Sequence, residues 1–281
     1  MAVVTDSTSD LPAERADELG IHVVPLRLAI GHRSALDGVE LGADGVVEAL
    51  RGKQQVSTSR PSPADFVTAY QKLLAAGAEH VVSVHISAEL SGTWDSARLA
   101  AQEFDYGVVR VVDSRSTSMA LGFAAIAAAR AAAEGAGPGA VQDAAVATVD
   151  RTLCIFYVDT LEYLRRGGRI GAAAAMVGTA LSVKPLLHVR DGRIVLLEKV
   201  RTSSRALARL VALTVEAAGD ATVDVAVQHL AAQERADQVQ EALRAQLPSV
   251  GQVVTGEVGA IVGAHTGPGV VGVALCRHPP G

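Results

Sequence analysis

The sequence has few aromatic side chains, which make up 3% of its 281 residues, whereas 49% of the residues are hydrophobic. Proteins that hold single-stranded nucleic acid stack bases on aromatic platforms, so this composition disfavours such a role. The formal net charge of −5 and the scattered basic residues also give no reason to approach a polyanion. No nucleic-acid partner is expected, and any enclosed cavity should have mainly aliphatic walls.

Cysteines and targeting signals are equally scarce. Cys154 and Cys276 both lie in apolar, strand-like runs, which predicts ordinary core residues in a reducing compartment. The first residues, "MAVVTDSTSD", have no basic start and turn polar early, so a cytoplasmic location is expected. Residues 258–276 are uncharged over a length that could cross a membrane, but His265 and five glycines argue against a bilayer helix.

Several motifs of self-sufficient enzymes are absent from the sequence. It has no Walker lysine loop, no G-x-G-x-x-G after a strand, no Cys/His set at zinc spacing and no G-x-S-x-G elbow. No metal or cofactor is therefore expected, and an independent kinase, dehydrogenase or hydrolase has little support.

The two halves of the chain have different patterns. In the first half, short apolar runs alternate with helical patterns, as in 80–87 followed by 91–104, which predicts βαβ units and a parallel sheet. In the second half, two strand-like runs flank Asp191-Gly192, a strong hairpin signal. The prediction is an α/β fold with a parallel-sheet domain over 1–150 and a domain with a mixed or antiparallel sheet over 151–281.

Polar residues gather where the apolar runs of the first half end, which is where open α/β sheets bind ligands. Helix capping explains Ser62 and Asp65 in "VSTSRPSPADF", with Pro63 in the first turn. It leaves residues 57–59 unexplained. In "SAELSGTWDSA", Gly92 would let an anionic oxygen approach the amides at a helix start, although a plain helix cap also fits this pattern. For "VTDSTSDL", capping and a site role are both open.

Two further segments are distinctive, the first explained by helix ending and dipole pairing and only the second predicted to carry a functional side chain. "LEYLRRGGRIG" predicts a helix that ends at Gly167-Gly168, with Arg165 and Arg166 in its last turn. In "VGAIVGAHTGPGVVGV", small residues surround His265, which predicts an accessible imidazole in a glycine-rich loop with a functional role.

Eight motifs, in their order and spacing, resemble the DegV family along nearly the whole chain. They are "DSTSDLP", "TSRPSPADF", "ISAELSGTWDSA", "VVDSRSTSMALG", "LEYLRRGGRI", "KPLL", "VRT" and "GAHTGPGVVG". The resemblance implies a two-domain α/β protein that encloses a long-chain fatty acid between its domains. It also implies that the protein is not an enzyme by itself but the fatty-acid-binding subunit of a bacterial fatty-acid kinase. A partner kinase would phosphorylate the bound carboxylate for phospholipid synthesis, and lipid exchange would involve transient membrane contact.

Position by position, the resemblance assigns roles to five residues. Thr58 and Ser91 would hold the fatty-acid carboxylate with their hydroxyls, beside the Gly92 amide. Arg201 in "VRT" and His265 in "AHTGPG" would support phosphoryl transfer.

The sequence leaves the orientation of one arginine and two alternative functions open, and it predicts one further helix. Arg60 stands where the family often has glutamine, and its orientation does not follow from the sequence. The uncharged residues 171–183 are predicted to form a helix that lines the acyl cavity. Two alternatives to the carrier are a stand-alone acyl hydrolase, with Ser91 as nucleophile and His265 as base, and a protein that binds a small anion.

Overall fold

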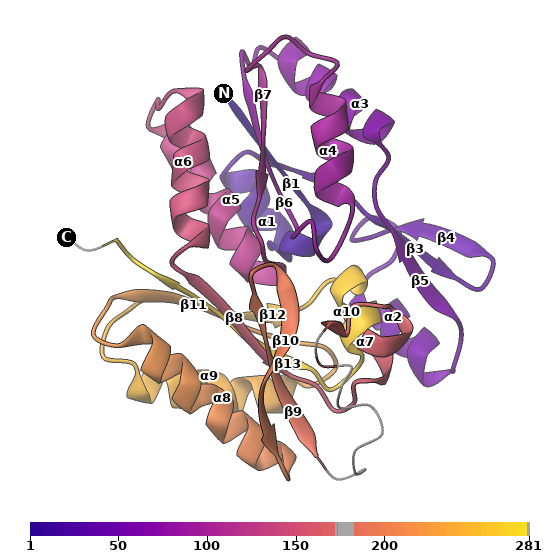
Figure 1. The fold of residues 1–281 in the computed structure, drawn as a ribbon, viewed down its shortest axis with the longest axis vertical. Coiled ribbons are helices and arrows are strands. Elements are labelled where there is room, and N and C mark those ends of the chain that lie inside the picture. Colours follow the sequence, from indigo (N-terminus) through magenta and orange to yellow (C-terminus); the bar gives the residue numbers. More distant parts are fainter. Residues whose placement is uncertain (172, 174–182, 280–281) are drawn as a thin grey trace.

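The structure is a computed structural model that describes residues 1–171, 173 and 183–279. Its first half contains a parallel four-stranded sheet in the order β2-β1-β6-β7 (Figure 1). The strands are β1 (Ala2–Asp6), β2 (Ile21–Val24), β6 (Val81–His85) and β7 (Val109–Asp113). All their pairings are parallel, so all four strands end at the same edge of the sheet.

Helices cover both faces of this sheet because successive strand residues point to opposite sides. Val4 and Val81 share a buried cluster with α3 and α4, whereas Val3 and Val82 share one with α5 and α6. The helices of this half are α1 (Ala13–Glu18), α3 (Pro63–Ala75), α4 (Thr93–Ala101), α5 (Ser118–Ala133) and α6 (Pro138–Val149), with a short 3-10 turn η1 (Ser7–Ser9).

The second half contains a six-stranded sheet in the order β10-β9-β8-β13-β11-β12. Only the pairing of β11 with β12 is parallel; the other four are antiparallel. Its strands are β8 (Thr152–Tyr157), β9 (Lys184–Arg190), β10 (Arg193–Val200), β11 (Val223–His229), β12 (Val250–Glu257) and β13 (Val271–Arg277). Helices α8 (Ser203–Ala218) and α9 (Gln233–Gln246) cover one face, and α5 packs on the other (Figure 1).

These sheets confirm the predicted fold class, a parallel α/β half followed by a mixed-sheet half. The predicted hairpin is also present: Asp191 and Gly192 connect β9 to β10 with φ values of 50° and 78°. Two positive φ values are what the tight turn of a hairpin requires. The change from one sheet to the next falls between Val149 and Thr152. The predicted division at residue 150 stays a prediction.

A third, antiparallel sheet was missed from the sequence. It consists of the short strands β3 (Arg27–Ile30), β4 (Arg33–Leu36) and β5 (Val56–Ser59) in the order β4-β3-β5. Helix α2 (Ala43–Arg51) packs beside it, together with α7 (Glu162–Arg166) and α10 (Ala260–Thr266) from the second half (Figure 1). Helix α10 therefore joins the two halves of the chain.

Two expectations concern long apolar segments. Within the described residues, no helix has the length and apolar character needed to cross a bilayer. The helix predicted over 171–183 lies almost wholly outside the described residues.

Candidate functional site

A cavity of about 310 Å³ lies between the two halves of the chain. Many of its residues come from β5, the loop after β6, β8, β13 and α10, and single residues come from α7, β10 and β11. The walls are mainly apolar, with Ile86, Leu90, Phe156, Leu164, Ile194 and Val262 among them. Its volume is at the lower end of the range of small-molecule sites.

Thr58 and His265 meet in this cavity although 207 positions separate them in sequence. Thr58 is on β5, and His265 is in the last turn of α10. The His265 Nε2 lies 2.8 Å from the Thr58 Oγ1. Packing of α10 on β3 and β5 brings the two side chains together.

His265 is uncharged at neutral pH, because burial and the positive charge of Arg169 lower the pKa of its imidazole to about 4. Its Nδ1 is buried and has no hydrogen-bond partner among the described residues. Gly167 lies against this atom: a Cβ on Gly167 would be 2.0 Å from Nδ1. The expectation of a glycine loop was wrong, because the segment is helical; His265 is partly buried and lines the cavity.

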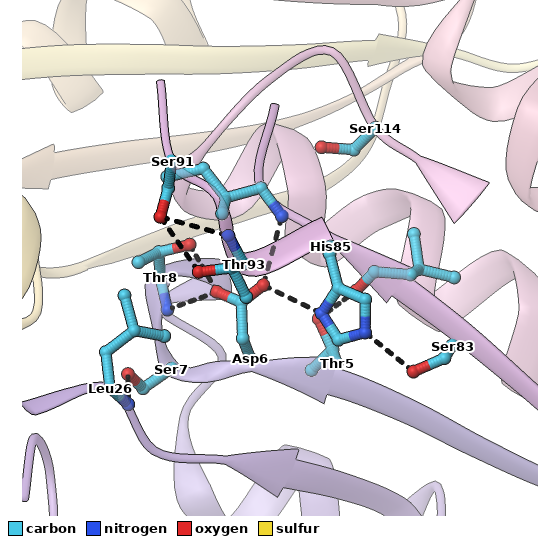
Figure 2. Close-up of polar contacts among 12 residues, drawn as sticks. Thr5, Asp6, Ser7, Thr8, Leu26, Ser83, His85, Ser91, Thr93 and Ser114 are labelled. Carbon is cyan, nitrogen blue, oxygen red and sulfur yellow. Dashed lines mark hydrogen bonds and ion pairs between the residues drawn. The ribbon is translucent and has the colours of Figure 1, made fainter. Parts of the chain in front are cut away.

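Ser91 lies at the start of α4, after the loop that follows β6. Its Oγ is 2.8 Å from the Thr93 Oγ1 and accepts a hydrogen bond from the Thr93 amide at 3.3 Å (Figure 2). Gly92 is the residue that precedes the helix, and it lines the cavity beside Ser91. Thr58, Ser91, Gly92 and His265, called the mouth cluster below, thus all line one cavity.

Two arginines flank the Ser91 loop. The Arg60 Nη1 donates to the Gly92 carbonyl at 3.4 Å, and the Arg169 Nε donates to the Leu90 carbonyl at 2.9 Å. Both line the cavity, and they are the only charged side chains among its described residues. Arg60 therefore faces the predicted carboxylate loop. The positive charge at the cavity favours an anionic ligand.

Arg201 lies apart from the mouth cluster. It is exposed, immediately after β10, and is not among the described residues that line the cavity. The β10 end that carries Arg201 is opposite the Asp191-Gly192 turn, where the Gly192 carbonyl accepts from Ser87.

Behind the Ser91 loop lies a fully buried group of hydrogen-bonded polar side chains that the sequence did not predict (Figure 2). The Asp6 carboxylate accepts from the Thr8 amide at 3.0 Å, the Ile86 amide at 3.0 Å and the His85 Nδ1 at 2.9 Å. The chain continues from the His85 Nε2 to the Ser83 Oγ at 2.6 Å, which accepts from the Tyr70 hydroxyl at 2.9 Å. We call Asp6, Thr8, Tyr70, Ser83 and His85 the Asp6 network; all five have zero exposure.

The order Asp6, His85, Ser83 is that of a catalytic triad, but the arrangement is structural. Neither Ser83 nor His85 lines the cavity. The network joins the end of β1 to the end of β6 through the Asp6 carboxylate. It therefore fixes the start of the loop that carries Ser91.

Two further carboxylates from the first half hold the start of α10. The Gly259 amide donates to Asp10 at 2.8 Å, and the Ala260 amide donates to Asp37 at 3.1 Å. Burial raises the pKa of Asp10 to about 8 and that of Asp37 to about 6. These contacts position the helix that carries His265.

The arrangement is suited to binding an anionic head with an apolar tail, since hydroxyls and two arginines surround the head position and aliphatic side chains line the rest. It lacks the geometry of a serine hydrolase. Ser91 is bonded to Thr93, whereas His265 is bonded to Thr58. No described carboxylate orients the His265 Nδ1, as a catalytic triad requires.

Comparisons with known proteins agree with the motifs. The family model described as "Uncharacterised protein, DegV family" matches residues 1–278. The chain belongs to the DegV family. A DegV domain-containing protein of Streptomyces coelicolor is 49% identical over 278 residues, which is 98% of each chain.

Solved structures of DegV family members share this fold. A protein from Thermus thermophilus, described under "fatty acid binding", is 34% identical with a TM-score of 0.94 over 99% of each chain. DegV from Bacillus subtilis, described as a fatty acid binding protein, is 32% identical with a TM-score of 0.89 over 99% of each chain.

Proposed function

We propose that this DegV protein binds a long-chain fatty acid, with the carboxylate at Thr58, Ser91 and Gly92 and the acyl chain in the apolar cavity. The observation that carries the proposal is the cavity itself, which has hydroxyls, a neutral imidazole and two arginines at one side and aliphatic walls elsewhere. Each methylene transferred from water to such walls contributes about 0.8 kcal/mol. The fatty acid binding described for the Thermus thermophilus and Bacillus subtilis relatives supports the same ligand.

Neutral donors suit a carboxylate that must react later. A bidentate arginine would occupy both carboxylate oxygens. Here Arg60 and Arg169 donate to the Gly92 and Leu90 carbonyls, so they supply positive charge while the hydroxyls orient the head. One carboxylate oxygen then stays available as a nucleophile.

The finer proposal is that the protein is a substrate carrier, not an enzyme by itself. A partner kinase would supply ATP, and a carboxylate oxygen would attack the γ-phosphorus, forming an acyl phosphate and releasing ADP. Arg201 and His265 would act during this transfer, in which a cation and a hydrogen-bond donor offset charge on the phosphoryl oxygens. The acyl phosphate would enter phospholipid synthesis in the cytoplasm, with lipid exchange by transient membrane contact.

Native mass spectrometry of the purified protein tests the ligand. A bound mass in the fatty-acid range is expected, and denaturation should release it. A protein that neither carries nor takes up fatty acid, but holds a small anion such as inorganic phosphate, would favour the small-anion alternative.

The carrier role is tested with partner kinase and ATP. Arg201→Ala and His265→Ala should retain bound fatty acid yet lose most acyl-phosphate formation, because interactions made only in the transition state leave ground-state affinity unchanged. Arg244→Ala, an exposed change on α9, is the matched control and should behave like the unmodified protein. Ester hydrolysis by the isolated protein would support the hydrolase alternative instead.

A further inference from the structure

A second cavity, of about 600 Å³, lies next to the first at the junction of the two halves. Its lining is mixed: Leu11, Val23, Met119 and Ala226 are among its apolar residues, and Asp10, Asp37 and Glu257 are acidic. Gln228 lines both cavities. Its side chain therefore stands at the partition between them.

The register of the six-stranded sheet explains this position. Gln228 on β11 pairs with Gly272 on β13, which pairs with Phe156 on β8, and all three line the first cavity. Alternate residues of a strand share a face, so Ala226 lies on the same face as Gln228, and Ala226 lines the second cavity. The same face of the six-stranded sheet thus lines both cavities, and Gln228 lies where one cavity meets the other.

Contacts from the other half of the chain hold the Gln228 carboxamide in place. Its Oε1 accepts from the Met119 amide at 3.0 Å, and its Nε2 lies 3.4 Å from the Asp10 Oδ2. The side chain is 5% exposed. Moving it aside would leave the buried Met119 amide and one side of Asp10 without a partner, which opposes displacement by an apolar chain.

The partition lies at the end of α10 opposite the mouth cluster. Asp10 accepts from the Gly259 amide at the start of α10, whereas His265 is in its last turn. At 1.5 Å per residue, the helix separates the two positions by roughly 9 Å. A chain whose head lies at His265 therefore approaches Gln228 with its interior or its methyl end.

We propose that Gln228 determines acyl-chain specificity by closing the first cavity against the second. This inference rests on the proposed fatty-acid function. Chains that fit the first cavity bind, and longer chains meet a carboxamide that is fixed on both sides.

The test compares binding of hexadecanoic, eicosanoic and docosanoic acids to the unmodified protein and to Gln228→Ala. Removing the carboxamide joins the cavities, so the variant should bind the longer acids roughly tenfold or more tightly, as burial of two more methylenes predicts. Hexadecanoic acid should bind about as before. Gln228→Val, which also shortens the side chain and suits a strand, replaces the alanine variant if that one does not fold.

Val262→Ala is the matched control, since it enlarges the first cavity from α10 without touching the partition. It should weaken all the acids without raising the longest chain accepted. The proposal is overturned if Gln228→Ala and Gln228→Val bind hexadecanoic acid and still reject longer acids, or if Val262→Ala extends the limit equally. If the unmodified protein binds none of the acids, it is the fatty-acid function itself that fails.

Discussion

The Asp6 network and the mouth cluster are built from similar side chains but have opposite properties. In the Asp6 network, serine, threonine and histidine are completely buried and form a continuous chain of hydrogen bonds (Figure 2). In the mouth cluster, the Thr58 and Ser91 hydroxyls line a cavity and are partly exposed, and each is bonded to one neighbouring side chain. Saturated bonding and zero exposure indicate a structural role, whereas partly exposed hydroxyls that line a cavity are placed to bind a ligand.

The largest expected effect comes from breaking the Asp6 network. Asp6→Ala leaves the buried His85 imidazole and the Thr8 and Ile86 amides without an acceptor. The free energy of unfolding should fall by about 3–5 kcal/mol, as measured by urea denaturation. Asp17→Ala, at an exposed site on α1, should change it by less than about 0.5 kcal/mol. Equal stabilities for the two variants would contradict the structural role.

Breaking the mouth cluster should instead affect binding. Thr58→Ala and Ser91→Ala should each weaken fatty-acid binding by about 1.5–3 kcal/mol, or roughly 10- to 150-fold, because each hydroxyl donates to a charged group. The ligand-free melting temperature should change little. Thr68→Ala, which removes an exposed α3 hydroxyl, should bind as the unmodified protein does in calorimetric titrations. Loss of stability without loss of affinity would mean that these hydroxyls have a structural role, like those of the Asp6 network, and do not bind the ligand.

A smaller effect concerns the carboxylates that hold α10. The pKa of Asp10 is raised from 3.8 to about 8 in the folded protein, so the folded state binds more protons than the unfolded state between these values. Stability should therefore fall as pH rises, by up to about 1.4 kcal/mol per pH unit. Above pH 6.5 the opposing contribution of His265, whose folded pKa is about 4, declines because the unfolded imidazole, with a pKa of 6.5, also loses its proton; Asp37, at about 6, is mostly titrated.

Asp10→Asn isolates this contribution. Asparagine tolerates the left-handed backbone at this position, where φ is 50°, and it cannot ionise. The variant should lose stability less steeply than the unmodified protein between pH 6.5 and 8 in chemical denaturation. Parallel curves for the two proteins would mean that Asp10 does not bind the proton.

Local patterns in the sequence predicted much of the fold. The Ser62 side chain accepts from the Asp65 amide, and the Asp65 carboxylate accepts from the Ser62 amide, as expected for a capped helix start with Pro63 in its first turn. The parallel sheet and the hairpin at Asp191-Gly192 likewise follow from short segments whose periodicity and turn residues are visible in isolation.

Other features depend on contacts that no local pattern encodes. The glycines of α10 lower helix propensity, so its sequence favours a loop. Gly263 packs closely on Leu230, since a Cβ would lie 3.0 Å from a Leu230 methyl carbon. The pairing of Asp6 with His85 spans 79 positions, and that of Thr58 with His265 spans 207. The assignment of Thr58 and Ser91 came from the family resemblance, and their ligand role stays a prediction.

The Thr58 and Ser91 hydroxyls of the mouth cluster are proposed to recognise a carboxylate, and the most direct measurement compares a long-chain fatty acid with the fatty alcohol of the same length. Both have the same hydrocarbon chain, so the difference in their dissociation constants isolates the head group. The unmodified protein should bind the acid about tenfold or more tightly than the alcohol. A Thr58→Ala, Ser91→Ala double variant should lose this preference while still binding the alcohol. Equal affinities of the unmodified protein for acid and alcohol would contradict the proposed carboxylate recognition.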